Sequence, residues 1–247
     1  MRSAADPCSY VVLKNVSKTF LDGDQKVHAV RDACLVASPG ELIVLLGPSG
    51  SGKTTLLTLI AGLLSPTSGS LSLFGQSLTS YSNGDLQSMR AKRIGFIFQN
   101  FLLIDSIPVV ENVAMVLRFS GRGRSDALAR ARELLDQFGI GYLARKLPSA
   151  LSQGEKQRVA VARAIANNPE LIIADEPTAS LETNQGFDII RLLHDYARQE
   201  RRCVIVATHD LRIADLADRV LRVVDGRVRV QCPQDQAKEV YPGRPVA

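Results

Sequence analysis

The sequence predicts an α/β fold built on a mostly parallel sheet, and three patterns support this class. Short apolar runs of strand length alternate along the chain with segments of helical periodicity, an order typical of parallel strands joined by crossover helices. One run, Glu41–Leu46, leads into the glycine-rich segment Gly47–Thr54, and a helical segment follows. Another run, Leu171–Ala174, ends in the adjacent carboxylates Asp175 and Glu176. Such wholly apolar runs suit strands that are buried on both faces of a sheet.

In the first part of the chain, a loose tail over residues 1–9 precedes several short strands. Polar and apolar residues alternate at Ser70–Phe74, as in a strand with one buried face. Lys53–Leu64 is rich in Leu, Thr and Ala at helical spacing, and Pro66 with Gly69 marks the turn after it. The strands expected here are Tyr10–Val16, Leu35–Ala37, Glu41–Leu46, Ser70–Phe74 and Ile94–Phe98.

In the second part, helical segments again alternate with apolar runs. A helix capped by Ser125 or Asp126 carries apolar residues at steps of three and four and ends at Gly139. Asp225-Gly226 between two apolar runs predicts a hairpin. The further helices expected are Glu155–Asn167 and Phe187–Arg198, and the further strands are Leu171–Ala174, Cys203–Ala207, Val220–Val224 and Val228–Val230. Residues 231–247 are polar and proline-containing, and we expect a tail.

Composition limits the classes of protein that this chain can represent. It has 247 residues, of which 45% are hydrophobic and 22% charged, so it can bury a core and is neither disordered nor a disulfide-stapled miniprotein. The net charge of +5 is mild, and nucleic-acid binding would need this excess gathered on one face. The nearest basic clusters are Arg118, Arg122, Arg124, Arg130 and Arg132, then Arg198, Arg201 and Arg202. We interpret both as solvated surface and expect no nucleic-acid partner.

The spacing of the cysteines and the absence of long apolar stretches indicate the cellular compartment that we expect for the chain. The four cysteines lie far apart without a CxxC pair, which favours reduced thiols in the cytoplasm over zinc ligands or disulfides. No stretch approaches 18 uninterrupted apolar residues, and residues 1–7 have no apolar core for export.

The glycine-rich segment matches a phosphate-binding loop. Gly47-Pro-Ser-Gly-Ser-Gly-Lys-Thr fits GxxxxGK[ST] and lies between a predicted strand and a predicted helix, the context that gives the motif its meaning. Backbone N–H groups of such a loop surround phosphate oxygens at the positive end of the helix. Lys53 would neutralise the outer phosphates, and the Thr54 hydroxyl would bind Mg²⁺. The adjacent acids then acquire roles, one near Mg²⁺ and the other aimed at an attacking water.

Further motifs identify a family. Gln99 closes a strand between the two motifs, Leu151–Glu155 (LSQGE) begins a helix before the acidic strand, Ser180–Glu182 follows the acids, and His209 ends a later strand. Over residues 10–230 the chain resembles the ATP-binding subunit of ABC transporters, and the run LSQGEKQRVAVAR is the most specific element. Two further runs, ADEPT after Ile173 and ENVAM after Val110, are similar to those of the lipoprotein-releasing and macrolide-exporter ATPase group.

The resemblance implies a domain plan and a division of labour in the site. The ABC ATPase domain would cover residues 10–230, with an N-terminal antiparallel β subdomain and an inserted helical subdomain over about 100–165. Glu176 would be the general base, His209 would contact the γ-phosphate, and Gln99 would touch Mg²⁺ and the attacking water. Mg²⁺ would lie near Thr54, Gln99 and Asp175. The residues implied to bind ATP are Phe20, stacked on adenine, then Gly47, Ser49, Gly50, Ser51, Gly52, Lys53, Thr54 and Thr55, with Ser152 and Gly154 acting from a second subunit.

The LSQGE segment also has a physical prediction of its own. Ser152 followed by Glu155 forms the pattern of a capping box, which leaves helix N–H groups pointing at an anion. Two departures from the family pattern are Gln153 in place of a glycine, at a helix start where φ is negative, and Glu182 in place of aspartate. Phe101, Leu102 and Leu103 have two interpretations, burial in the core or a groove for a helix of the membrane subunit.

The resemblance therefore implies an ATPase subunit on the cytoplasmic face of a membrane. Two copies would close head to tail, each ATP held between the phosphate loop of one and the LSQGE segment of the other, and would drive a permease for export or extraction from the membrane. One alternative is mechanical signalling across the membrane without transport. A soluble ABC ATPase acting on DNA or ribosomes is less favoured, because the interval from Lys53 to Ser152 leaves no room for a coiled coil. Intact Lys53, Glu176 and His209 argue against an inactive scaffold.

Overall fold

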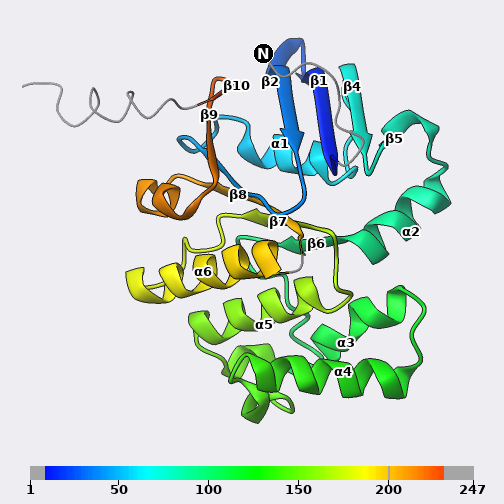
Figure 1. The fold of residues 1–247 in the computed structure, drawn as a ribbon, viewed down its shortest axis with the longest axis vertical. Helices are drawn as coiled ribbons and strands as arrows, with labels where there is room; N and C mark the ends of the chain where they lie inside the picture. The colour runs from blue at the N-terminus through cyan, green and yellow to red at the C-terminus, as the bar shows by residue number, and fades with distance from the viewer. Residues whose placement is uncertain (1–8, 200, 231–247) are drawn as a thin grey trace, which may run out of the picture.

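A six-stranded sheet forms the middle of the molecule in this computed structural model, which describes residues 9–199 and 201–230 (Figure 1). The strand order is β10-β9-β3-β8-β7-β6, and every neighbouring pair except β10 with β9 is parallel. The strands are β3 (Leu42–Leu46), β6 (Ile94–Ile97), β7 (Leu171–Asp175), β8 (Cys203–Thr208), β9 (Arg219–Val224) and β10 (Arg227–Val230). The prediction of an α/β fold with a mostly parallel sheet is confirmed.

A second, antiparallel sheet packs on one side of the first, as the family resemblance implies. Its order is β2-β1-β4-β5, with β1 at Val11–Asp22, β2 at Gln25–Ala37, β4 at Ser68–Leu73 and β5 at Gln76–Ser77. β1 and β2 form one long hairpin and extend well beyond the predicted Tyr10–Val16 and Leu35–Ala37. The sequence missed the extension because most of its side chains are exposed and carry no apolar alternation.

The two faces of the central sheet bury different cores, and β3 divides between them. Its residues Leu42, Val44 and Leu46 pack with the helices of one face, whereas Ile43 and Leu45 pack with α1 (Lys53–Ile60) and the antiparallel sheet. This division follows from the two-residue period of a strand. All five residues of β3 are buried, which explains why its sequence shows an unbroken apolar run.

Helices α3 (Val109–Phe119), α4 (Arg124–Gln137) and α5 (Gln153–Ile165) lie together on the side of the parallel sheet away from the antiparallel sheet (Figure 1). The remaining long helices are α2 (Asn83–Arg93) and α6 (Thr183–Gln199), and short 3₁₀ turns lie at Leu78–Ser80, Gly141–Leu143, Pro148–Ala150 and Leu211–Leu216. Sequence analysis predicted neither α2 nor α3. Met89 is the one buried residue described in α2, and α3 opens with β-branched valines that favour strands.

Several predicted boundaries shift for local reasons. α1 ends at Ile60 and not at Leu64, because the chain turns at Gly62 with a left-handed φ of 64°. α5 and α6 begin before the predicted Glu155 and Phe187. Apart from Ser9, which is buried, the tails expected at residues 1–9 and 231–247 lie outside the described residues. None of the described helices is long and apolar enough to span a membrane.

Candidate functional site

Four parallel strands end along one edge of the central sheet, and each leads into a predicted site residue. Leu46 of β3 pairs with Thr208 of β8, and Asp175 of β7 pairs with Ala207 of the same strand. The phosphate loop, Glu176, His209 and Gln99 therefore all emerge at the carboxyl ends of the strands, where ligands bind in open α/β sheets. Sheet topology thus brings together motifs that are far apart in the chain.

The loop after β3 needs its glycines for close backbone approaches. Gly52 has φ of 102°, and a Cβ there would lie 2.2 Å from the Ala29 carbonyl oxygen. A Cβ at Gly47 would lie 2.1 Å from the Val223 carbonyl oxygen. Only hydrogen fits at both positions, so the loop is held against β2 and β9 while its other side stays open to a ligand.

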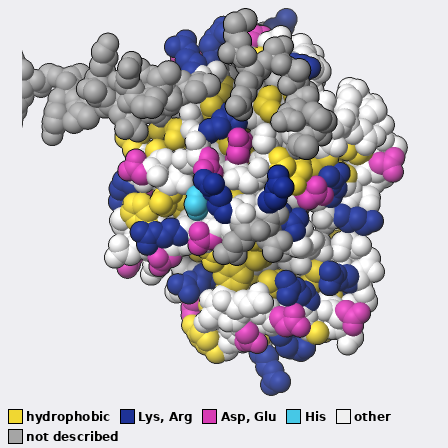
Figure 2. All heavy atoms as spheres, viewed as in Figure 1, with side chains coloured by type: hydrophobic (Ala, Val, Ile, Leu, Met, Phe, Trp, Pro, Cys, Tyr) yellow, Lys and Arg dark blue, Asp and Glu magenta, His cyan; other side chains and the backbone are white. Residues whose placement is uncertain are grey.

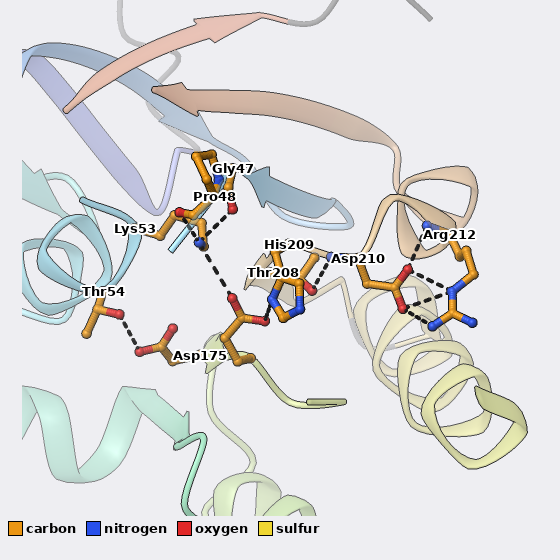
Figure 3. Close-up of polar contacts among 10 residues, drawn as sticks. Gly47, Pro48, Lys53, Thr54, Asp175, Thr208, His209, Asp210 and Arg212 are labelled. Carbon is orange, nitrogen blue, oxygen red and sulfur yellow. Dashed lines mark hydrogen bonds and ion pairs between the residues drawn. The ribbon is translucent and has the colours of Figure 1, made fainter. Parts of the chain in front are cut away.

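Lys53 reaches back across this loop from the first position of α1. Its buried Nζ donates hydrogen bonds to the carbonyl oxygens of Gly47, at 2.8 Å, and Pro48, at 2.9 Å (Figure 3). It also lies 3.5 Å from Glu176 Oε1. A single ammonium group therefore faces both the phosphate loop and the acid at the end of β7.

Thr54 and Asp175 form a second polar pair. Thr54 Oγ1 donates to Asp175 Oδ2 at 2.8 Å (Figure 3), while Asp175 Oδ1 is buried without a hydrogen-bond partner among the described residues. Desolvation raises the pKa of Asp175 above its usual value. The buried Ser51 hydroxyl also lacks a partner in the described chain. Unsatisfied oxygen atoms of this kind fit a hard cation and phosphate.

Glu176 occupies a strained backbone position next to Lys53. Its φ of 47° is left-handed, and its N–H donates to the Ala207 carbonyl oxygen at 2.8 Å. Its Oε2 lies 3.0 Å from His209 Nδ1, and the His209 ring is 60% exposed. Strained non-glycine residues concentrate at functional sites, and here the geometry turns the carboxylate between a buried cation and an accessible imidazole.

A cleft of 1410 Å³ opens over these groups and contains most of the predicted site. The predicted residues that line it are Ser49, Gly50, Gly52, Lys53, Thr54, Thr55, Gln99, Glu176 and His209. Gly47, Ser51, Asp175 and Phe20 do not line it, although Phe20 pairs with Val27, which does. Figure 2 shows charged side chains of both signs around a histidine on this face.

The LSQGE segment lies apart from the cleft, whose lining includes neither Ser152 nor Gly154. The predicted capping box is confirmed: Ser152 Oγ accepts from the Glu155 N–H at 3.3 Å, and the Ser152 N–H donates to Glu155 Oε2 at 2.7 Å. Gln153 is the first residue of α5 and is exposed, and it is not among the described residues with positive φ. At Gly154 an added Cβ would lie 2.6 Å from Gln185 Oε1.

Sequence analysis missed two groups that support the site. Tyr142 donates its hydroxyl to Glu155 Oε1 at 2.8 Å. Arg212 binds both carboxylate oxygens of Asp210, beside His209 (Figure 3), and it donates to Thr183 Oγ1 at 3.1 Å. No local pattern in the sequence marks the contact of Tyr142 with Glu155 or that of Arg212 with Thr183, because these partners lie 13 and 29 residues apart and meet only in the folded chain.

The apolar residues after Gln99 differ in burial, and the core interpretation holds for part of this segment. Phe101 is buried, Leu102 is 56% exposed, and Leu103 packs partly against the core. An open apolar groove lies near this segment, where pockets of 580 and 280 Å³ share Ala91 and Phe119. The ring of Phe119 is 73% exposed.

Comparison with known proteins gives the site a context. The sequence pattern of the ABC transporter family matches residues 30–179. HrtA of Staphylococcus haemolyticus (strain JCSC1435), by its name a hemin import ATP-binding protein, is 38% identical over 218 residues, 88% of this chain and 98% of HrtA. The macrolide export ATP-binding/permease protein MacB of Aggregatibacter actinomycetemcomitans is 35% identical over 228 residues, 92% of this chain but 35% of MacB.

Solved structures agree with the fold. The dimeric ATP-binding cassette MJ0796, in a post-hydrolysis state bound to ADP and Pi, superposes with a TM-score of 0.83 at 37% identity, covering 88% of this chain and 96% of the cassette. The protein cbiO1 of Clostridium perfringens, part of the ABC transporter complex cbiONQ, has a TM-score of 0.80 at 28% identity, covering 94% and 91%.

Proposed function

We propose that this chain, which belongs to the ABC transporter family and is an ATP-hydrolysing, ATP-binding protein, closes with a second copy around each ATP to drive a membrane permease. The observation that carries this proposal is the position of Glu176. Its carboxylate lies 3.5 Å from the Lys53 ammonium and 3.0 Å from the His209 ring, at the rim of the cleft. A base in this position can accept the proton of a water aligned with the terminal phosphate.

Each group then has a distinct part in hydrolysis. Lys53 and the loop N–H groups bind the outer phosphates. His209, which contacts the carboxylate oxygen of Glu176 other than the one near Lys53, binds the terminal phosphate. Water attacks the γ-phosphorus in line, the bond to the β-phosphate oxygen breaks, and Glu176 takes the proton from the water. Gln99, which lines the same cleft, orients that water.

The residues present also fit Mg²⁺. Thr54 and Asp175 offer adjacent oxygen atoms, Asp175 Oδ1 is buried without a partner in the described chain, and Gln99 adds an amide oxygen. When bound, the ion neutralises charge on the phosphate oxygens. Burial raises the pKa of Asp175, and a bound cation would favour the ionised carboxylate.

The second copy supplies what the cleft of one chain lacks. Ser152 and Gly154 lie outside the cleft at the N-terminus of α5, where free N–H groups and the helix dipole favour an anion. In a head-to-tail dimer we place this terminus against the partner's γ-phosphate. The dimeric state of the MJ0796 cassette, 37% identical to this chain, supports the arrangement.

The apolar groove supports a permease partner on the cytoplasmic face of the membrane. It is lined by residues of α2, β6 and α3 and exposes Phe119, a surface that fits a short helix with an apolar face. We propose export or extraction from the membrane, supported by the similarity to MacB, a macrolide export protein. Because HrtA is named for import, direction needs its own test: in vesicles that contain the permease, export moves cargo away from the ATPase side.

The substitution Glu176→Gln tests the proposed hydrolysis. Glutamine keeps the shape and can still hydrogen-bond a water, but it cannot accept a proton. We expect hydrolysis to slow at least about 100-fold, while binding of ATP by Lys53 and the loop survives. Light scattering with Mg-ATP should then detect a dimer more readily, because hydrolysis no longer reopens it.

Glu133→Gln is the matched control, because Glu133 is a 62% exposed carboxylate on α4 that pairs only with Arg130 among the described residues. It should hydrolyse ATP like the unmodified protein. Normal hydrolysis by Glu176→Gln would show that another group is the base. A slow variant that stays monomeric with ATP would contradict closure with a second copy of this chain.

A further inference from the structure

The loop after Gln99 has an unusual backbone. Phe101 and Leu102 are consecutive non-glycine residues with left-handed φ values of 59° and 45°. Side chains disfavour this conformation, because Cβ crowds the following carbonyl. Two tight turns enclose the pair, from the Phe101 N–H to the Phe98 carbonyl at 3.0 Å and from the Leu102 N–H to the Asn100 carbonyl at 2.6 Å. Such a segment stays in place only when its surroundings hold it.

Arg163, near the end of α5, provides that hold. Its two terminal nitrogens donate 2.5 Å hydrogen bonds to the carbonyl oxygens of Leu102 and Phe101. The planar guanidinium presents its donors in a fixed fork, so it fixes two successive peptide groups at once. A lysine at this position could not reproduce that geometry.

Within the described chain, the buried guanidinium makes hydrogen bonds to these two carbonyl groups only. Arg163 is 7% exposed, and within residues 9–199 and 201–230 its hydrogen bonds go to these backbone carbonyls and not to a carboxylate. Desolvation lowers the pKa of Arg163 to about 10, so the group stays charged at neutral pH. Burying a charge without a counterion is costly, which indicates that the position of this loop matters.

We propose that Arg163 is a positioning residue for hydrolysis: by fixing the Phe101–Leu102 backbone it places Gln99, two residues earlier, in the catalytic cleft. This inference rests on the proposed role of Gln99. Because Arg163 belongs to α5, the helix that Ser152 caps, the contact joins the LSQGE helix to the loop of Gln99. Its side chain also lines the 280 Å³ pocket of the apolar groove, so a partner seated there would contact the same group.

A double-mutant cycle separates positioning from general loss of structure. Arg163→Lys, Gln99→Ala and the combined variant are compared for kcat, KM and thermal unfolding, with ATP affinity measured by a fluorescent analogue. Arg132→Lys, at an exposed position of α4, is the matched control and should match the unmodified protein. If Arg163→Lys does not fold, Arg163→Gln, which keeps a neutral N–H donor, replaces it in the cycle.

If Arg163 acts through Gln99, either single change should lower kcat about tenfold or more with KM within about twofold. The combined variant should then be no slower than Gln99→Ala, within about twofold. Multiplied losses, or an unchanged kcat in Arg163→Lys, would overturn the inference while leaving the role of Gln99 intact. Normal hydrolysis by Gln99→Ala would instead refute the role of Gln99, and the inference with it.

Discussion

The cleft at the strand ends and the LSQGE helix start are built by different means. In the cleft, Lys53, Glu176 and His209 come from segments that follow three different strands, and Glu176 contacts the other two within a single chain. At the start of α5, Ser152 and Glu155 lie three residues apart and cap their own helix. The first region depends on the topology of the sheet, and the second on local hydrogen bonds.

This difference indicates which region can work alone. The cleft of one chain already contains an ammonium group and an imidazole, with buried oxygen atoms beside them. We therefore expect one chain to hold the phosphates of a nucleotide. The helix start presents N–H groups beside the acidic Glu155 of its own first turn, and the anion that these N–H groups favour must come from elsewhere. We therefore expect substitutions in the cleft to alter binding by one chain, and substitutions at the helix start to alter closure of the dimer.

The largest effect is expected for Lys53→Ala. The loop loses its buried cation, and the Glu176 carboxylate loses its partner at 3.5 Å. Tight ATP binding or turnover should be abolished, measured with a fluorescent nucleotide and by phosphate release. Lys14→Ala, at an exposed position of β1, should bind and hydrolyse normally. Turnover by Lys53→Ala at the unmodified rate would contradict the assignment of the phosphate loop.

A smaller, pH-dependent effect is expected for Tyr142→Phe. Hydrogen bonds from the Ser152 N–H and the Tyr142 hydroxyl hold the pKa of Glu155 below its usual value. The ionised Glu155 therefore stabilises the folded protein above the ordinary pKa of 4.5, and this contribution is lost as the pH falls through the lowered pKa. At pH 7 we expect the melting temperature of the variant to decrease by less than about 3 °C, and we expect ATP binding to be unchanged.

On acidification below the lowered pKa of Glu155, the difference in melting temperature between Tyr142→Phe and the unmodified protein should narrow. Tyr10→Phe serves as a control, because the Tyr10 hydroxyl donates to a backbone carbonyl, that of Arg201. A difference that widens in acid would refute the role given to the Glu155 charge.

The smallest effect is expected for Gln153→Gly. Gln153 is exposed at the first position of α5, a position that accepts either residue. Hydrolysis should stay equal or rise, as measured by steady-state phosphate release. A fall of more than about tenfold, equal to about 1.4 kcal/mol of barrier, would reveal a contact of Gln153 across the dimer.

The elements that the sequence predicted are those whose signal is local. β3, β7 and β8 were recognised because each is buried along its whole length. The sequence did not predict α2, because this helix buries few side chains. It did not predict the outer half of the β1–β2 hairpin, because the side chains there face solvent. Tertiary contacts decide such elements.

Within the candidate site, motifs predicted the charged groups to which we assign the chemistry but not the residues that support them. Lys53, Asp175 and Glu176 stand in patterns with a known physical purpose. Arg163, in contrast, contacts Phe101 across 62 residues of sequence, and Arg212 contacts Thr183 across 29. Nothing in the spacing of such residues marks them, since their partners are set by how the helices pack on the sheet.

Mixing two inactive variants tests most directly the claim that each ATP site is shared between copies. Lys53→Ala removes the phosphate-loop cation, and Ser152→Phe blocks the helix start. Both are checked for native melting. In a head-to-tail dimer of the two, both defects fall in one site and leave the other intact. We predict that each variant alone is inactive and that a 1:1 mixture recovers about a quarter of the original activity, the fraction of intact sites after random pairing. A mixture no more active than its separate components would contradict the shared site.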